Sequence, residues 1–251
     1  MISRIRNQWQ LIVILVILLP ILALFGFWGY VQIASYSADI DYVERIEQNK
    51  NITITEYSSY YALTPDAVDE SKSAIIYYPG GLVDPGSYLY KMGNVAIELE
   101  TKVFITKPYF NLVITGISAS DGIIEQEALS QPVIGGHSLG VVAACRYTNN
   151  SPESVAGLFL FGSYCDVDIS DQDTIVVSIM GLEDGIIDRG NYQESKSSLP
   201  ARTNIVEIEQ LNHSDFGNYG LQSGDNPSQL SDEEVIELLS GNLEFFEIVS
   251  N

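Results

Sequence analysis

Four short apolar runs, each ended by glycine, constrain the fold of this chain more than any other feature. They are "IIYYPGG" (75–81), "PVIGG" (132–136), "GLFLFG" (157–162) and "TIVVSIMG" (174–181). Runs of this length that are apolar on both faces are typical of strands in a parallel sheet with helices on both sides. Segments with helical spacing separate the runs, and this alternation predicts an α/β fold.

Other segments complete the alternation. Alternating residues at 51–65 predict one or two antiparallel strands, and apolar runs at 102–107 and 203–209 predict two further strands. Ser231, followed by Glu234, matches the capping box that begins many helices. Helices are predicted over four segments, 87–101, 118–129, 141–150 and 231–249.

The N-terminal region has a different character. Between Arg6 and Asp39 no side chain is ionisable except tyrosine, and this stretch exceeds the roughly 20 residues that a helix needs to cross a bilayer. We therefore expect a cytoplasmic tip and one transmembrane anchor in residues 1–35, and one globular domain over 36–251. The small residues of 34–38 leave a cleaved signal peptide open as the alternative.

The distribution of charge predicts the orientation of that anchor. Arg4 and Arg6 precede the apolar stretch, and positively charged flanks stay cytoplasmic. The domain is thus expected on the extracytoplasmic side of the cell membrane, or secreted if the segment is cleaved. All 33 acidic residues but only 10 of the 12 lysines and arginines follow Arg6, which gives that part a net charge of −23. Such a domain repels nucleic acid, so no nucleic-acid partner is expected.

Residues that carry chemistry follow the predicted strand ends. Binding sites in such sheets form beyond the carboxyl ends of the strands. There the sequence has a glycine turn in "PGGLVDPGSY", a serine in "GGHSLG" (135–140), an acid in "GLEDGIID" and a histidine in "QLNHSDFG". The last three are Ser138, Asp184 and His213, in that order along the chain.

These three residue types together suit nucleophilic catalysis. A serine hydroxyl needs a neighbouring base to accept its proton, and histidine titrates near neutral pH. A carboxylate on the far imidazole nitrogen fixes the histidine tautomer. We predict Ser138 as nucleophile, His213 as base and Asp184 as the orienting acid. Two other acids, Glu183 and Asp188, compete with Asp184, which we prefer because it directly precedes a glycine past a strand end.

The segment "GGHSLG" fits the G-x-S-x-G elbow, whose glycines allow a tight turn between strand and helix. The backbone N–H of Leu139 would then begin a helix and stabilise a developing oxyanion. A second donor is expected from the glycine turn, with Gly81 and Leu82 both open. His137, within the elbow, is expected to point away from Ser138, which leaves His213 as the only histidine available as base.

The order Ser, Asp, His around this elbow resembles the α/β-hydrolase superfamily. More narrowly, "YYPGGLVDPGSY", "KPYFNLVI", "GGHSLG", "GLEDGIID" and "NHSDFGNYGLQSGD" look like a bacterial group of small, dienelactone-hydrolase-like serine hydrolases. The resemblance covers roughly Ser73 to the C-terminus and implies a serine esterase. The chain departs from the group at Val141, where a second glycine is common. True dienelactone hydrolases use cysteine as the nucleophile, so Ser138 argues against that substrate.

The expected reaction is cleavage of a small-molecule carboxylic ester through an acyl-enzyme, without metal or organic cofactor. The link 162–173 is too short for a helical lid, so we expect an open pocket lined by Leu82, Tyr109, Phe110 and Tyr164. Such a pocket favours small or short-acyl esters. Acyl transfer or amide cleavage on the same fold is one alternative, and a non-catalytic binding module on the membrane is another.

The chain has two cysteines, Cys145 and Cys165. Both lie in segments predicted to be regular and packed. The interpretation favours two buried, unpaired thiols, with a disulfide as the alternative.

Overall fold

The structure is a computed structural model that describes residues 2–246, with side chains from residue 14 onward. The chain divides into two compact units, 1–35 and 36–251. The last residues of the helix predicted over 231–249 lie outside the described part.

Helix α1 (Ile2–Ala34) makes up the first unit. Its stretch Ile14–Ala34 has 21 residues with a mean hydropathy of 2.4, long and apolar enough to cross a membrane. Most of its apolar side chains are exposed in the protein itself. That composition suits a membrane span or a signal sequence.

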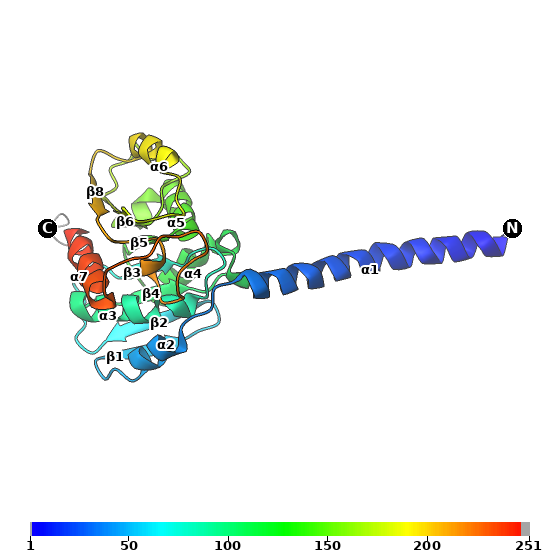
Figure 1. Cartoon of the computed structure of the whole chain (residues 1–251), viewed down its shortest axis with the longest axis horizontal. Helices are drawn as coiled ribbons and strands as arrows, with labels where there is room; N and C mark the ends of the chain where they lie inside the picture. The colour runs from blue at the N-terminus through cyan, green and yellow to red at the C-terminus, as the bar shows by residue number, and fades with distance from the viewer. Residues whose placement is uncertain (1, 247–251) are drawn as a thin grey trace. The chain divides into compact units, whose positions relative to one another are not determined.

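The second unit is built around an eight-stranded sheet (Figure 1). The strand order is β1-β2-β4-β3-β5-β6-β7-β8, in which β1 and β2 are antiparallel to their neighbours and all strands from β4 to β8 run parallel. The predicted mostly parallel sheet is thus confirmed. The strands are β1 (Ile52–Glu56), β2 (Tyr60–Pro65), β3 (Ile75–Tyr78), β4 (Val103–Thr106), β5 (Val133–His137), β6 (Gly157–Phe161), β7 (Val176–Gly181) and β8 (Thr203–Ile208).

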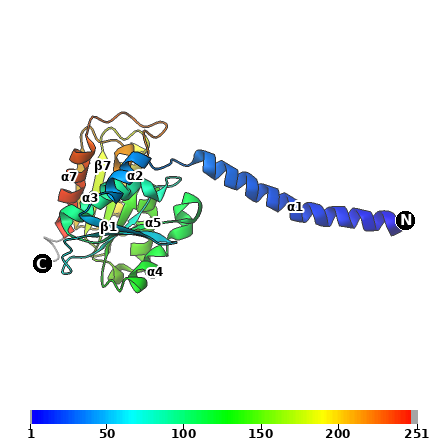
Figure 2. The same ribbon diagram turned by 90° about the horizontal axis from the view of Figure 1, so that it is seen from below.

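Helices cover both faces of the sheet (Figure 2). On one face α3 packs against α2 and α7, and on the other α5 lies over β3, β5 and β6 with α4 near β4. Apolar residues along the strands alternate between these faces: Ile75 and Tyr77 join the first cluster, Ile76 and Tyr78 the second. The helices are α2 (Ile40–Glu47), α3 (Leu89–Leu99), α4 (Ala119–Gln126), α5 (Leu139–Asn150), α6 (Arg189–Ser195) and α7 (Asp232–Leu243).

Two of these helices, α2 and α6, were not predicted. Each begins at an aspartate whose side chain accepts a backbone hydrogen bond, Asp39 from Asp41 N–H and Asp188 from Asn191 N–H. Asp is a preferred N-cap because its carboxylate satisfies one of the free N–H groups at a helix start. The predicted capping box of α7 is present, with Ser231 and Glu234 bonded reciprocally.

Cys145 of α5 and Cys165 are joined by a disulfide, with their Cα atoms 5.5 Å apart. The favoured interpretation of two unpaired thiols is therefore wrong. Both residues are buried, as predicted, but apolar surroundings do not tell whether two sulfur atoms meet. The bond fastens the helix that follows β5 to the segment that follows β6.

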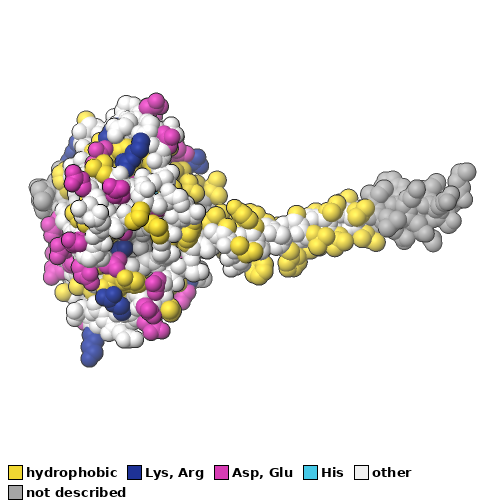
Figure 3. All heavy atoms as spheres, viewed as in Figure 1, with side chains coloured by type: hydrophobic (Ala, Val, Ile, Leu, Met, Phe, Trp, Pro, Cys, Tyr) yellow, Lys and Arg dark blue, Asp and Glu magenta, His cyan; other side chains and the backbone are white. Residues whose placement is uncertain are grey.

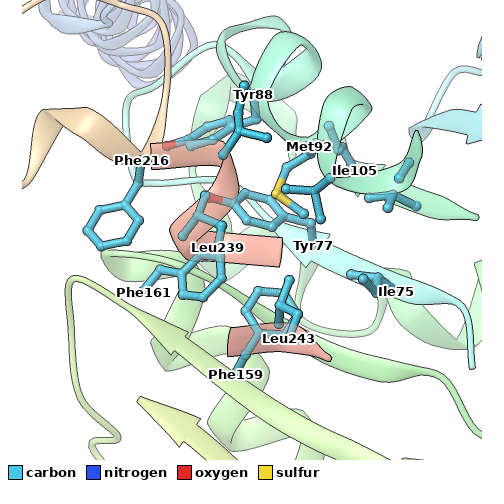
Figure 4. Close-up of a cluster of buried hydrophobic side chains, with 14 of the residues drawn as sticks. Ile75, Tyr77, Tyr88, Met92, Ile105, Phe159, Phe161, Phe216, Leu239 and Leu243 are labelled. Carbon is cyan, nitrogen blue, oxygen red and sulfur yellow. The ribbon is translucent and has the colours of Figure 1, made fainter. Parts of the chain in front are cut away.

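The aromatic core extends toward the carboxyl ends of the strands. Tyr77, Tyr88, Phe161 and Phe216 lie together in this cluster (Figure 4). Phe216 stacks on Phe161 with ring centroids 5.4 Å apart. It follows His213 by three residues, so the loop that carries this histidine is packed on the core.

The strand order predicts a ligand site at the same edge. Strand β3 lies between β4 and β5, so the order reverses there, and ligands in such folds bind at this reversal. Loops after β3 and β5 begin at the reversal. Acidic side chains are spread over the face shown in Figure 3, without a comparable basic patch there.

Candidate active site

Ser138 lies at the turn between β5 and α5. Its backbone is in a strained conformation, φ 54° and ψ −122°, which an L-residue adopts only when its surroundings enforce it. The Ser138 N–H donates to the Phe161 carbonyl at the end of β6, at 3.1 Å. This is the strand-turn-helix geometry that a G-x-S-x-G elbow requires.

Two glycines let the elbow pack against the end of β3. A Cβ atom on either Gly136 or Gly140 would overlap the backbone carbonyl oxygen of Tyr78. Any larger residue would thus separate β3 from the elbow. The glycine turn that follows β3 is held beside Ser138 for this reason.

Asp184 and His213 form a buried pair at the ends of β7 and β8. His213 Nδ1 lies 2.8 Å from Asp184 Oδ2, and both side chains are fully buried. The other carboxylate oxygen accepts the backbone N–H groups of Ile186 and Ile187, each at 2.9 Å. Burial by itself raises the pKa of Asp184, but the hydrogen bond and charge of His213 outweigh it and hold that pKa below its ordinary 3.8. Asp184 is therefore an ionised acceptor that fixes the His213 ring.

The two competing acids lie elsewhere. Asp188 caps helix α6 and Glu183 is exposed. Neither is bonded to the His213 ring in the described part of the chain, so of the three candidate acids Asp184 is the one that the structure places on that ring.

A second carboxylate, Asp225, was not predicted from the sequence and joins the two loops. Its oxygens accept the backbone N–H groups of Gly185 (2.9 Å) and Ser214 (2.8 Å) and the Ser214 hydroxyl (2.7 Å). A longer contact of 3.4 Å reaches the N–H of His213. Asp225 thereby ties the loop that carries the acid to the loop that carries the histidine. It lies in "SGDN", whose composition indicates only a turn.

His137 also contacts the pair, which the sequence analysis did not predict. Its ring is fully buried and packs on the His213 ring, with centroids 4.4 Å apart. Its Nδ1 lies 3.0 Å from the Tyr88 hydroxyl, which accepts the N–H of Gly80 at 2.9 Å. Burial, followed by the nearby His213, holds the pKa of His137 well below its ordinary 6.5, so this ring stays neutral.

No hydrogen bond joins Ser138 to the histidine within the described part of the chain. His213 Nε2 is buried and has no partner among the described residues. It is one of ten buried side-chain N and O atoms without a partner among the described residues, and His137 Nε2 is another. The nitrogen that a serine nucleophile would use is thus withdrawn from water and uncommitted.

The turn Gly80–Asp84, called here the oxyanion turn, follows β3. Leu82 is left-handed (φ 57°), and its N–H donates to the Asn111 carbonyl at 2.8 Å. That N–H is already engaged, so of the two predicted turn donors Gly81 remains. Leu139 is the first residue of α5, where backbone N–H groups have no intrahelical partner.

Comparison with known proteins bears on this arrangement. The sequence model of the "Alpha/beta hydrolase family" matches residues 74–237, which include the elbow, the acid and the histidine. The chain belongs to the alpha/beta hydrolase family. No curated protein matches it.

Solved structures share the fold of this family member at low sequence identity. A Thermoplasma acidophilum protein titled "predicted CIB-like hydrolase" has a TM-score of 0.61 and 12% identity, covering 77% of this chain and 99% of its own. An esterase of Pyrobaculum calidifontis gives 0.59 and 10%, covering 83% and 89%. A membrane phospholipase A, described as a bacterial virulence factor, gives 0.58 and 10%, covering 96% and 99%. These likenesses show the fold alone.

In this alpha/beta hydrolase, an apolar cavity of about 510 Å³ lies beside the oxyanion turn. It is lined mostly by apolar side chains, among them Leu82, Val113, Ile117, Leu139 and Val142. Of the four residues predicted to line a pocket, only Leu82 does so. Tyr109 and Phe110 are exposed on the neighbouring 3-10 turn Tyr109–Asn111, and Tyr164 does not reach the cavity.

The described residues contain no group of three His, Cys, Asp or Glu side chains placed to hold a metal ion. What the arrangement offers is a strained serine, a buried carboxylate–imidazole pair, and backbone N–H groups at a turn and a helix start. That set is suited to acyl transfer.

Proposed function

We propose that this protein is a serine hydrolase that cleaves carboxylic esters through an acyl-enzyme. The observation that carries the proposal is the buried Asp184–His213 pair, in which His213 Nε2 has no hydrogen-bond partner among the described residues. The elbow supplies the only nucleophile predicted for that nitrogen. Catalytic hydrogen bonds in unliganded enzymes are often long and tighten when substrate binds, so rotation of the Ser138 side chain is the expected first event.

The proposed cycle has two steps. His213 Nε2 takes the hydroxyl proton while Ser138 Oγ attacks the ester carbonyl carbon. The oxyanion that forms accepts hydrogen bonds from the N–H groups of Leu139 and Gly81. The imidazolium, stabilised by Asp184, then protonates the departing alkoxide and an acyl-enzyme remains. In the second step a water molecule, deprotonated by His213, releases the acid and restores Ser138.

The cavity beside Leu139 and Gly81 supports an assignment of the acyl group. Both proposed oxyanion donors lie at its edge, so a carbonyl bound there directs its acyl chain into an apolar space. A volume of about 510 Å³ lies within the roughly 300–1,000 Å³ typical of small-molecule sites. The space therefore suits acyl chains that are longer than the shortest ones. Rates measured on esters of increasing acyl length will test the preference for short acyl groups that is expected from the sequence.

We also propose that residues 1–35 anchor the enzyme in the cell membrane with the hydrolase unit outside the cytoplasm. The apolar stretch Ile14–Ala34, the preceding Arg4 and Arg6, and the Cys145–Cys165 disulfide support this placement. Disulfides persist in oxidising compartments. Protease added to intact cells should degrade the hydrolase unit, and protection of the unit until the cells are lysed would contradict the orientation.

The test of catalysis is fluorophosphonate labelling of the full chain in detergent. Wild-type protein should label, and Ser138→Ala and His213→Ala should not. Ser130→Ala, which changes an exposed serine before the start of β5, at the opposite end of that strand from the elbow, should label normally. A series of short-, medium- and long-acyl esters, with matched amides and added alcohol, then identifies acyl group and acceptor. Folded wild-type protein without label would exclude the serine hydrolase and favour a binding module.

A further inference from the structure

The chain enters the second unit at Tyr36, two positions after α1 ends at Ala34. Tyr36 forms a parallel bridge with Val83 of the oxyanion turn. Its N–H donates to the Leu82 carbonyl at 2.7 Å, and its own carbonyl accepts the Asp84 N–H at 2.9 Å. The backbone of one residue therefore holds the turn at two points.

The same short segment also binds the loop that follows the histidine. The Tyr36 hydroxyl accepts the Ser223 N–H at 3.0 Å, and its ring lies 5.7 Å from that of Tyr219. Asp39 N–H donates to the Asn218 carbonyl at 2.9 Å. Tyr36 thus links the turn proposed to bind the oxyanion to the loop that carries the base.

The oxyanion turn needs such support because of its conformation. Leu82 is left-handed at φ 57°, which its side chain disfavours. Strained residues of this kind persist only where the surroundings over-determine them. Asn111 holds the N–H of Leu82 and Tyr36 holds its carbonyl, so the peptide groups on both sides of Leu82 are fixed. Gly81, the proposed oxyanion donor, directly precedes this residue.

We propose that Tyr36 is a positioning residue for the oxyanion turn, acting through its backbone N–H and C=O. This inference rests on the proposed function, since it assigns Tyr36 to the stabilisation of the oxyanion at Gly81. A donor held in place before the reaction stabilises a developing charge at no further cost in reorganisation.

The inference also bears on the cleaved-signal alternative. The small residues that form a potential cleavage site, Ala34, Ser35, Ser37 and Ala38, flank Tyr36 on both sides. A cut after Ala34 keeps Tyr36 with the hydrolase unit, whereas a cut after Ala38 removes it. A mature protein that is active should therefore retain Tyr36.

The test compares two proline substitutions in the full-length chain in detergent. Tyr36→Pro deletes the N–H that Leu82 accepts. Ser37→Pro is the matched control, because Ser37 is exposed and none of its backbone groups is hydrogen-bonded within the described structure. Tyr36→Pro should lower kcat for a soluble chromogenic ester by about 10- to 100-fold, with KM changed by less than about 3-fold. Ser37→Pro should stay within about 3-fold of wild type, because it keeps the bridge.

Hydrogen exchange supplies a readout that does not depend on turnover. Proline keeps the carbonyl that accepts the Asp84 N–H, so the Asp84 amide reports whether the bridge as a whole opens: it should be protected in wild type and exchange faster in Tyr36→Pro. If Tyr36→Pro does not fold, Tyr36→Gly, which frees the backbone and removes the ring, should still lower kcat several-fold. Equal kcat in wild type and Tyr36→Pro, or an equal loss in Ser37→Pro, would overturn the inference while the hydrolase assignment stands. Failure of Ser138 to label in wild type would instead refute the proposed function.

Discussion

The two halves of the candidate site are built differently. In the acid–base half, at the ends of β7 and β8, the carboxylates of Asp184 and Asp225 accept hydrogen bonds from their own and each other's loops. In the oxyanion half, at the ends of β3 and β5, the turn is held mainly by backbone groups of Tyr36 and Asn111, together with the hydroxyl of Tyr88.

This difference teaches which half a local motif can describe. A carboxylate that accepts backbone N–H groups marks its position in the sequence by its residue type. Backbone groups, such as the N–H and C=O of Tyr36, come with almost any residue type and leave no such mark. The oxyanion half should accordingly be sensitive to a proline at Tyr36, and the acid–base half to replacement of Asp184 or Asp225.

The largest expected effect belongs to the acid–base half. Asp184→Asn should lower kcat/KM for a chromogenic ester by about 10⁴-fold, because an amide in that position favours the wrong tautomer of His213. Asp188→Asn is the matched control: it replaces one good N-cap of α6 by another and should leave kcat/KM within about 3-fold. Comparable losses in both variants would show that Asp184 has no special role.

The disulfide gives the next largest effect, on the oxyanion half. Cys145→Ala combined with Cys165→Ala opens a loop with a sequence separation of 20. The free energy of unfolding should fall by about 3 kcal/mol, measured by urea unfolding. Labelling of Ser138 at 25 °C should persist, since the elbow keeps its bond to Phe161. Unchanged stability would mean that the bond does not form in the protein as purified.

Asp225→Ala should act on the acid–base half without touching the reacting atoms. Without the carboxylate oxygens of Asp225, the loop that carries His213 is no longer tied to the turn at Gly185. A displacement of a catalytic group by about 1 Å can lower the rate by about 10²-fold. We expect kcat to fall by about 10- to 100-fold with Asp184 and His213 intact. Activity equal to that of wild type would show that the two loops hold their geometry without Asp225.

The smallest effect concerns His137, which contacts both halves. Its pKa is well below 6.5 when folded and ordinary when unfolded, so below pH 6.5 only the unfolded chain takes up that proton. As the pH is lowered below 6.5, the free energy of unfolding should therefore decrease by up to about 1.4 kcal/mol per pH unit because of this group. Urea unfolding of wild type and His137→Phe at pH 5, 6 and 7 measures the difference in slope. Parallel slopes would show that His137 does not titrate differently in the folded state.

Most of the sheet could be predicted from the sequence because the central strands are buried on both faces. Their apolar runs, such as 157–162, carry no competing periodicity. Helices α2 and α6 could not, because Ile40–Glu47 has only 8 residues and Arg189–Ser195 only 7, which is too short for helical spacing to be recognised. Their N-capping aspartates were the available signal.

The candidate site divides in the same way. Ser138, Asp184 and His213 could be nominated because each follows a predicted strand and parallel strands end at one edge. The choice between Gly81 and Leu82 as oxyanion donor required knowledge of the hydrogen bond from the Leu82 N–H to the Asn111 carbonyl, which the spacing of residues in the sequence does not predict. The packing of His137 on His213 depends on ring orientation, and the Cys145–Cys165 bond on a distance between two elements.

The acidic surface of the hydrolase unit has a consequence for the solution around it. A net charge of −23 on the residues after Arg6 attracts protons and other cations and depletes anions within a Debye length, about 10 Å at 0.1 M salt. The local pH at the active site is then lower than that of the bulk. The pH at which activity rises should therefore be higher in dilute buffer than in buffer with added salt. The rate of cleavage of negatively charged esters should increase most when salt is added.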